Sequence, residues 1–441
     1  MGSDLPQARL LWEVDVDGFG GDELFVTDLD GDGQPEILMR QSAGGGRAEL
    51  VFQRFGPRGM YTEAERHLNC ISAVDLKGNL LWQGGEAHRG EHPYFWHGSA
   101  GFAVACLEGD PLPDVLAVVW DVLTVLDGRS GAVKAELKVP TDNFNNIVPV
   151  NLQGDPTRQQ LLVKAGGRAY PPCTRPGNPT FVLDSDLSEL WVETDYPCVG
   201  CRPVVLDLDN DGCEEILVGS CLVDHDGQRL WTLLWVDAEK EHVDHVNPVD
   251  LKGDGRIQLA YAVDGGDFLL VDTQGEEVWR REHRHAQSSI AGRFRSDVEG
   301  LAIVLTEKWI GMTCYTPEGH RLWHREGVGY GRRTVSGWGE GGLDLILYEP
   351  HLLKRRDACP YHSVPEETRN FWPYLMDGEG NRAVELPWKE DYVQPGQLIR
   401  GFRAYDYGIV FHNQVMDLDG DGRDEVVVWD RRRVMAFGAP D

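Results

Sequence analysis

Short apolar runs alternate with Gly- and Asp-rich turns along most of the chain. The runs are rich in Val, Ile and Leu, and turn residues bound each of them, which is the pattern of β-strands rather than helices. No long segment carries a helical repeat of apolar positions. The hydrophobic pattern therefore predicts an all-β chain.

An acidic loop separates the first two strands of each predicted unit. Its clearest copies, with the pattern D-x-D-x-D-G-x-x-E, occupy 28–36, 207–215 and 417–425. An apolar run leads into each copy or its remnant, and we count eight such runs: 24–27, 101–107, 147–151, 202–206, 246–249, 290–294, 334–337 and 414–416. A second apolar run follows each loop, so the chain is predicted to contain eight related units.

A second hairpin signature follows in several units. It reads apolar, Asp, x, x, Gly, x, x, apolar, Trp over 74–82, 223–231 and 271–279, and it has Thr in place of the Asp over 315–323. This spacing suits a tight turn between a third and a fourth strand. The central units recur roughly every 44 residues, the period of four-stranded propeller blades. We expect the Trp residues at the blade ends to pack between blades rather than to form a platform for sugars.

The two ends of the chain complement each other. The run 8–14 resembles an outermost strand without a blade of its own, and the last unit, ending at 433–437, lacks that strand. Pairing the two would close the ring and remove two exposed sheet edges. We therefore predict a single all-β propeller domain over 1–441 with eight four-stranded blades, or seven as the alternative, and with long insertions around 41–70, 349–375 and 389–412.

The balance of charge limits the partners. Acidic residues outnumber Lys and Arg by 72 to 42, giving a formal net charge of -30. This excess disfavours nucleic acid and anionic membranes. It does not exclude an acidic polysaccharide or oligosaccharide, because a local basic cluster or a bound cation can bind one. We expect a monomer.

The N-terminal residues lack the basic and apolar regions of a signal peptide, and no apolar run is long enough to span a membrane. We expect a cytoplasmic protein if Met1 is native and a secreted one if a signal peptide has been removed. The nine Cys show no disulfide framework. The close pair Cys198 and Cys201 could be two ordinary thiols or part of a metal or redox site.

The three acidic loops contain candidate metal ligands. Carboxylates at alternate positions, followed by Gly and a closing Glu, suit a hard cation such as Ca²⁺, although the spacing is not that of an EF-hand. The candidate ligands are Asp28, Asp30, Asp32, Glu36, Asp207, Asp209, Asp211, Glu215, Asp417, Asp419, Asp421 and Glu425. A plain acidic turn is the alternative, and it is what we expect of the degenerate copies 250–258 and 151–155. The Ca²⁺ is expected to be structural, with a further role in the active site left open.

Polar residues other than Asp concentrate in loops that would converge on one face of a propeller. The candidate catalytic residues are His97, Lys164, Arg168, Tyr170 and His245, and the candidate substrate-binding residues are Asn145, Asn146, His242, His285, Lys308 and Arg333. A solvated basic loop is the alternative for the set around Lys164, and loop capping is the alternative for His242 and His245. Nucleophile-elbow, phosphate-loop, dinucleotide and zinc-protease motifs are absent from the sequence.

The blades resemble those of β-propeller polysaccharide lyases, above all the rhamnogalacturonan lyases and more distantly the ulvan lyases. The stretches that carry the resemblance are 145–151, 159–165, 242–250 and the acidic loops, which are similar to FG-GAP or VCBS repeats. Rhamnogalacturonan lyases usually begin with a fibronectin-like β-domain, whereas this chain starts directly in the predicted propeller. Its acidic loops are also fewer.

The resemblance implies β-elimination at a uronic acid. Arg168 or Lys164 would neutralise the carboxylate, with Asn145 and Asn146 holding it. His245 or His97 would remove the C5 proton, and Tyr170, alone or together with the His, would protonate the departing O4. The competing functions are a non-catalytic propeller that binds carbohydrate or protein, and a glycoside hydrolase acting on a rhamnose-uronate linkage.

Overall fold

The computed structural model describes residues 5–16, 20–21, 23–42, 69–87, 101–119, 121–139, 144–165, 180–194, 196, 202–233, 242–308, 310–327, 329–350, 352–354, 372–387, 389, 406–408, 412–430 and 432–441. The chain forms two compact units. One consists of Val14–Val243 and is called the 14–243 unit. The other consists of Met1–Glu13 with Asp244–Asp441 and is called the 244–441 unit.

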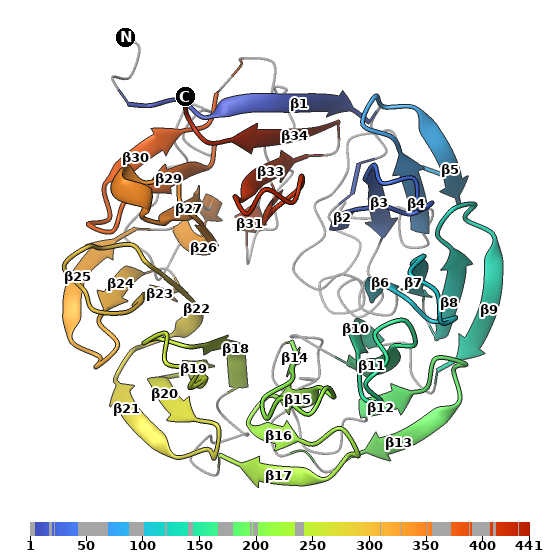
Figure 1. Ribbon diagram of the computed structural model, residues 1–441, viewed down its shortest axis with the longest axis horizontal. Coiled ribbons are helices and arrows are strands. Elements are labelled where there is room, and N and C mark those ends of the chain that lie inside the picture. The colour runs from blue at the N-terminus through green and yellow to red at the C-terminus, as the bar shows by residue number, and fades with distance from the viewer. Residues whose placement is uncertain are drawn as a thin grey trace. The chain divides into compact units, whose positions relative to one another are not determined.

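Four antiparallel sheets of four strands make up the 14–243 unit (Figure 1). In each sheet, consecutive strands are hydrogen-bonded neighbours, as in a meander. The sheets are β2 (Glu23–Thr27), β3 (Glu36–Ser42), β4 (Asn69–Val74) and β5 (Leu80–Gly84); β6 (Phe102–Ala105), β7 (Asp114–Val119), β8 (Val122–Asp127) and β9 (Val133–Lys138); β10 (Phe144–Val150), β11 (Gln160–Ala165), β12 (Thr180–Leu183) and β13 (Glu189–Glu193); and β14 (Val204–Leu206), β15 (Glu215–Val218), β16 (Cys221–Val223) and β17 (Arg229–Thr232).

The 244–441 unit also contains four sheets of four strands. They are β18 (His242–Val249), β19 (Gln258–Asp264), β20 (Phe268–Asp272) and β21 (Glu277–Arg281); β22 (Ala286–Gly292), β23 (Ala302–Glu307), β24 (Gly311–Tyr315) and β25 (Arg321–Glu326); β26 (Gly329–Val335), β27 (Leu345–Pro350), β29 (Tyr374–Met376) and β30 (Arg382–Glu385); and β32 (His412–Met416), β33 (Glu425–Trp429), β34 (Arg433–Gly438) and β1 (Arg9–Asp15). A short 3₁₀ turn, Glu340–Gly342, precedes β27.

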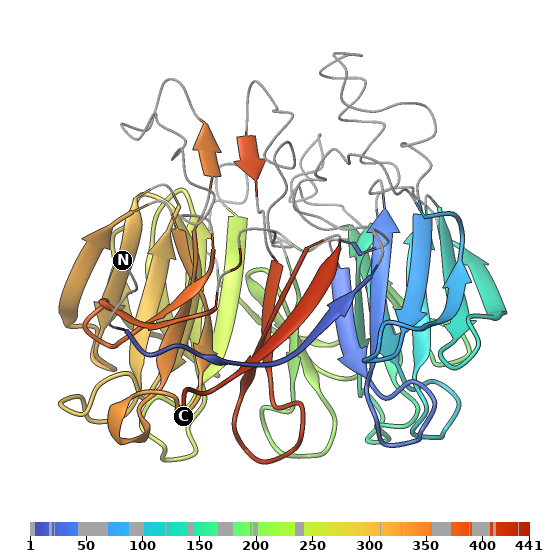
Figure 2. The same ribbon diagram turned by 90° about the horizontal axis from the view of Figure 1, so that it is seen from above.

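These eight sheets are the four-stranded blades of a β-propeller, so the predicted fold class and blade count are confirmed. The last sheet has the order β1-β34-β33-β32, with the N-terminal strand in the outermost position (Figures 1 and 2). The predicted pairing of the two chain ends is therefore also confirmed. The single domain over 1–441 stays a prediction. In the described part of the chain, no helix combines the length and the hydropathy needed to cross a bilayer.

The second strand of a blade is buried on both faces. Every residue of β15, β23 and β33 is buried, whereas β17 and β25 contain no buried residue. Neighbouring blades share their cores, because Phe268 and Leu270 of one sheet pack with Ile303 and Leu305 of the next. This burial explains why the second strands read as unbroken apolar runs.

The Trp residues that close the hairpins do pack between blades. The indole Nε1 of Trp82 donates to the carbonyl oxygen of Gly128 in the next blade at 2.8 Å, and that of Trp279 donates to Pro317 at 2.9 Å. The interpretation of these residues as structural is confirmed, because the indole N–H of each donates a hydrogen bond to a turn of the next blade.

The first strands begin earlier than the apolar pattern predicts. β18 starts at His242 rather than at 246, β22 at Ala286 rather than at 290, and β10 at Phe144 rather than at 147. The prediction that His242 and His245 lie in a loop is therefore wrong. Polar side chains at the start of an inner strand interrupt the hydrophobic pattern, while the backbone continues to pair with the second strand.

Two of the predicted insertions contribute a small sheet of their own. β28 (Leu352–Lys354) and β31 (Asp406–Gly408) pair antiparallel, with Leu352 opposite Gly408 and Lys354 opposite Asp406. Figure 2 shows the two strands projecting beyond the blades, where they follow β27 and precede β32. The rest of these insertions, and 43–68 of the first one, lie outside the described residues.

Candidate functional site

A cluster of titratable side chains lies where β18 begins and β19 ends, within the 244–441 unit. The ring Nδ1 of His285 is 2.8 Å from Oδ1 of Asp264, and its Nε2 is 3.4 Å from Oδ2 of Asp244. The backbone carbonyl of His285 accepts the N–H of Lys308, which is buried, at 3.0 Å. His285 thus joins the first blade of this unit to the second.

The two carboxylates determine the charge of His285. Burial by itself would lower the pKa of the imidazole, but its hydrogen bonds with Asp244 and Asp264 have the opposite effect, and the net shift is upward. The protonated form, with its positive charge between two carboxylates, is therefore more favoured than in a free imidazole. A histidine held in this way is better suited to donating a proton or balancing charge than to accepting a proton.

His245 lies on β18 next to Asp244 and is partly exposed. Its Nδ1 accepts the backbone N–H of Ser289 on β22 at 3.5 Å, which is a long contact. A neutral ring with this contact carries its proton on Nε2, so Nδ1 is the basic nitrogen. The ring can therefore present an unprotonated nitrogen at the junction of two blades.

A second histidine cluster lies on the outer side of the same junction. His283 Nδ1 is 2.9 Å from Glu307 Oε2, and His283 Nε2 is 2.7 Å from the hydroxyl of Tyr315. Burial would raise the pKa of Glu307, but the hydrogen bond from His283 leaves it lowered. Burial and the Glu307 carboxylate raise the pKa of Tyr315 to about 12.

The His283 cluster lines a cleft of about 480 Å³ formed by the β21–β22 connection and the sheet β22–β25. The cleft also contains Thr313, Arg321 and His324. Glu307 and Tyr315 were not among the candidates from the sequence, since each lies in an apolar segment typical of a buried strand. The local signal in the sequence was the pair of consecutive charged residues Glu307, the last residue of β23, and Lys308 directly after it.

The third blade of the unit places its basic residues differently. Arg332 Nε lies 3.1 Å from Oε2 of the buried Glu349, which also accepts Nδ2 of Asn413 at 2.9 Å. The Arg332 guanidinium also lies over the Tyr330 ring, 4.4 Å from its centroid. Arg333, the predicted substrate-binding residue, is exposed on β26.

In the 14–243 unit, Asn146 on β10 lies opposite Lys164 on β11. Lys164 has no exposed surface. It lies on the same face of β11 as Leu162, which packs with Ile216 of the adjacent blade. The ammonium therefore points between blades. Four other predicted residues cannot be placed with it, because His97, Arg168, Tyr170 and the side chain of Asn145 lie outside the described part of the chain.

The first acidic loop folds around its own carboxylates. Asp28 Oδ1 accepts the N–H of Gly31 at 2.6 Å, and its Oδ2 accepts that of Gly33 at 2.9 Å. Glu36 closes the loop by accepting the N–H of Leu29 at 2.7 Å. Carboxylate oxygens of Asp28, Asp30 and Asp32 lie within 4.8 Å of one another. The predicted ligands are thus brought together, as they also are at Asp207, Asp209 and Glu215.

The degenerate loop shows which of these contacts the turn itself needs. Asp250 Oδ2 accepts the N–H of Gly255 at 2.7 Å, as Asp28 does for Gly33, although the loop lacks the carboxylates that correspond to Asp30 and Glu36. The backbone conformation therefore depends on the first Asp and the Gly. The additional carboxylates have an electrostatic cost, because burial and the neighbouring Asp charges raise the pKa values of Glu36, Glu215 and Glu425.

The acidic loops and the histidine cluster lie at opposite ends of the strands. The Asp250 loop follows the last residue of β18, whereas His245 and Asp244 lie near its first. Eight residues of extended strand separate the two ends by roughly 23 Å. A cation in the Asp417 loop, which follows β32 in the same way, would accordingly lie away from the histidines.

No protein-family model matches the chain, and no curated protein matches it. Among solved structures, rhamnogalacturonan lyase YesW is 16% identical with a TM-score of 0.57, covering 99% of this chain and 75% of that chain. A rhamnogalacturonan lyase of Bacillus licheniformis is 16% identical with a TM-score of 0.58, covering 100% and 76%. The biofilm matrix protein Bap1 of V. cholerae is 12% identical with a TM-score of 0.61, covering 99% and 91%.

At these identities the similarity concerns the fold alone. The matched structures include lyases and a matrix protein, so one propeller architecture serves proteins with different functions. The eight blades of this chain belong to that architecture, the β-propeller shared with the rhamnogalacturonan lyases.

Proposed function

We propose that the protein is a polysaccharide lyase that cleaves a uronic-acid-containing polysaccharide or oligosaccharide of the rhamnose-uronate type by β-elimination. Rhamnogalacturonan lyases are among the structures that match nearly the whole chain. The fold is also that of non-lyases, so the proposal depends on the chemistry of the strand ends.

The observation that carries the proposal is the geometry of His245. Its Nδ1 lies 3.5 Å from the backbone N–H of Ser289, so the neutral form of the ring carries its unprotonated nitrogen there. A partly exposed imidazole in this state can take the C5 proton of a uronate near neutral pH. The C4–O4 bond then breaks, a C4=C5 double bond forms, and the departing O4 takes a proton.

His285 and Lys308 are proposed to supply the positive charge that this reaction needs. The uronate carboxylate must be neutralised before its C5 proton becomes acidic enough to remove. His285, held by Asp244 and Asp264, is the proposed charge-balancing group, and its backbone carbonyl accepts the backbone N–H of Lys308. The roles expected of Lys164, Arg168, Tyr170, Asn145, Asn146 and His97 stay predictions.

The acidic loops are proposed to bind structural Ca²⁺. Their support is the clustering of carboxylate oxygens in two loops of the 14–243 unit. Within the 244–441 unit, the Asp417 loop lies at the strand ends opposite His245, as the Asp250 loop does, and this favours a structural rather than a catalytic cation there.

Ultraviolet absorbance tests the proposal, because elimination alone creates a conjugated unsaturated uronide. Rhamnogalacturonan, ulvan and rhamnose-glucuronate glycans are each incubated with the protein, with Ca²⁺ or with chelator. We expect absorbance to rise with one substrate class, and we expect His245→Ala to lower the rate by roughly 100-fold or more, as for loss of a general base.

His320→Ala is the matched control, since His320 is exposed on the β24–β25 hairpin at the other end of the strands. It should leave the rate unchanged. New reducing ends without ultraviolet absorbance would show hydrolysis instead of elimination. Binding of a glycan without any product would assign the protein to the non-catalytic propellers.

A further inference from the structure

The acidic loop of the β14–β15 hairpin differs chemically from the other two. Cys213 occupies the position that Gln34 and Arg423 hold in those loops. The hairpin that follows carries His225, whereas the first blade has Leu76 at the same place in the Asp-x-x-Gly signature. A thiol and an imidazole have therefore been added to a set of carboxylates in one blade.

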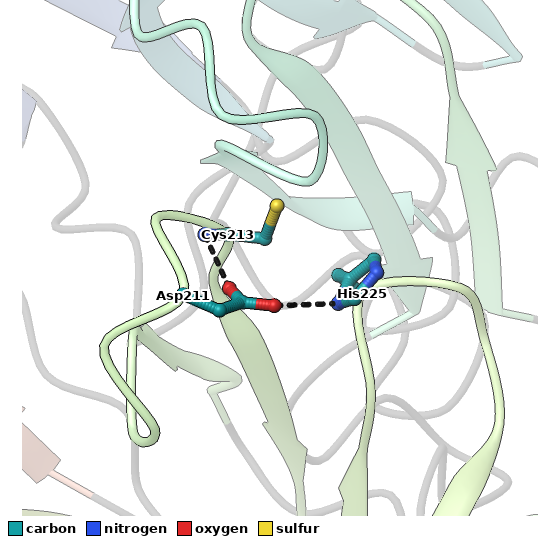
Figure 3. A group of neighbouring side chains, drawn as sticks. All are labelled: Asp211, Cys213 and His225. Atoms are coloured by element: carbon teal, nitrogen blue, oxygen red, sulfur yellow. Dashed lines mark hydrogen bonds and ion pairs between the residues drawn. The ribbon is translucent and has the colours of Figure 1, made fainter.

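The folded chain brings these groups together (Figure 3). Ligand atoms of Asp211, Cys213 and His225 all lie within 4.8 Å of one another, and so do those of Glu215, Asp224 and His225. His225 belongs to both groups. Its Nδ1 lies 3.8 Å from Asp211 Oδ2, close to the roughly 3.4 Å that separates two ligands of a tetrahedral zinc ion.

Two buried atoms of the cluster lack hydrogen bonds within the described residues. Glu215 is 3% exposed, and while its Oε2 accepts the N–H of Leu208 at 2.7 Å, its Oε1 has no hydrogen-bond partner. The Nδ1 of His225 also has none, although it lies at ion-pair distance, 2.9 Å, from Asp224 Oδ1. Buried polar atoms are rarely left unsatisfied without a function.

We propose that Cys213, His225 and Asp211 bind a divalent transition-metal ion of the zinc type, with Glu215 or Asp224 as a further ligand. Sulfur, nitrogen and oxygen donors together favour such an ion over Ca²⁺, which takes oxygen ligands. On binding, the Cys213 thiol releases its proton to solvent and coordinates as the thiolate.

The proposed site competes with Ca²⁺ in this loop alone. Asp211 and Glu215 are also predicted Ca²⁺ ligands, so one loop cannot serve both ions with the same oxygens. The loops at 28–36 and 417–425, which lack the thiol and the imidazole, should bind Ca²⁺ whether or not the transition metal is present. The blade β14–β17 would thus bind a different ion from the other two blades that contain the full acidic loop.

Cobalt provides the test, because a Co²⁺–thiolate bond absorbs in the near ultraviolet. The metal-free, reduced full-length protein is titrated with Co²⁺ and then with Zn²⁺. We expect about one equivalent to produce a tetrahedral spectrum with a thiolate band that Zn²⁺ abolishes. Cys213→Ser should lose the band. His225→Gln should weaken Co²⁺ binding by more than the roughly 10- to 100-fold that loss of an outer-shell partner costs.

Two controls separate this site from other thiols. Cys106→Ser removes another partly exposed thiol, and the double variant Cys198→Ser/Cys201→Ser removes the close pair; both should keep the band. Alkylation of the unmodified protein needs no variant, and Zn²⁺ should protect Cys213 but not Cys106. A band that survives in Cys213→Ser, or Zn²⁺ that leaves the alkylation of Cys213 unchanged, would overturn the proposal.

Discussion

His285 contacts Asp264 and thereby links two neighbouring blades, with 2.8 Å between the imidazole Nδ1 and the carboxylate Oδ1. The partners come from the end of β19 and the segment before β22. The contact is mostly buried, with 12% of the His285 side chain and 16% of the Asp264 side chain exposed. An ion pair in such surroundings is screened less by salt than a surface pair.

The stability of the protein should fall as the pH rises through the titration of His285. The folded-state pKa of His285 is raised above its ordinary value of 6.5. Its contribution is therefore fully present below pH 6.5 and is lost as the pH rises through the folded-state pKa. Thermal unfolding midpoints measured from just below pH 6.5 upwards should converge between the unmodified protein and His285→Gln. The control His320→Gln should follow the unmodified protein, and parallel pH profiles for all three would contradict the assignment.

Calcium should stabilise the protein through the intact acidic loops. Free Ca²⁺ at 100 times the Kd of a loop would stabilise the unit that holds it by about 2.7 kcal/mol. Asp32→Asn should remove most of this effect for the first loop, since the amide oxygen can still accept the Gln34 N–H at 2.7 Å but the ligand charge is lost. Calorimetric titration with Ca²⁺ and thermal unfolding both measure it.

Asp254→Asn is the matched change in the degenerate loop. Asp254 accepts the N–H of Arg256 at 3.1 Å, as Asp32 does for Gln34, but its loop lacks the carboxylates that correspond to Asp30 and Glu36. The variant should leave the Ca²⁺ effect unchanged. Equal losses in Asp32→Asn and Asp254→Asn would favour plain acidic turns.

Gly131 allows Trp82 to pack against the next blade. Its φ is +68°, and a Cβ there would lie 2.5 Å from Trp82 Cε3. Gly131→Ala should cost about 1–2 kcal/mol for the left-handed backbone and about 1–3 kcal/mol more for the steric clash. Gly33→Ala, measured in chelator, should cost only the backbone part, because its φ is +84° and nothing lies within 4 Å of its Cβ position. Denaturant unfolding of the two variants gives the difference, and equal costs would contradict the packing argument.

Arg40 joins two blades of the 14–243 unit as a buried cation. It donates through Nη1 to the Gly101 carbonyl and through Nη2 to the Val118 carbonyl, each at 2.7 Å. Burial lowers the pKa of Arg40 to about 10. Arg40→Met leaves buried carbonyls without these donors and should cost at least about 3 kcal/mol in denaturant unfolding. Arg129→Met, at an exposed arginine, should cost less than about 0.5 kcal/mol.

Much of the architecture was predictable from the sequence because it depends on local regularities. The apolar runs, the acidic turns and the Trp at each hairpin repeat at short range, so they specify strands and blades without knowledge of distant contacts. The pairing of the run 8–14 with the last unit was predictable, because that run had no blade of its own and the last unit lacked one strand. The starts of β10, β18 and β22 were missed, since polar residues there break the hydrophobic alternation while backbone pairing persists.

The grouping of functional side chains was decided by the tertiary structure. The sequence identified His245, His285 and Lys308 as candidates, but it could not reveal that His285 contacts both Asp244 and Asp264. Those contacts depend on the register of β18 with β19 and on the packing of one blade against the next.

The candidate metal sites likewise combine features that the sequence predicted with contacts that only the tertiary structure decided. Alternating carboxylates in 207–215 predicted a cation loop from the sequence alone, because all the ligands lie within nine residues. Cys213 and His225 are twelve positions apart on two different hairpins, and only the antiparallel pairing of β15 with β16 brings their ends together. The sequence by itself therefore determined the repeating strands and turns. The three-dimensional packing decided which side chains meet, because these meetings depend on strand register and on contacts between blades, and no local pattern encodes either.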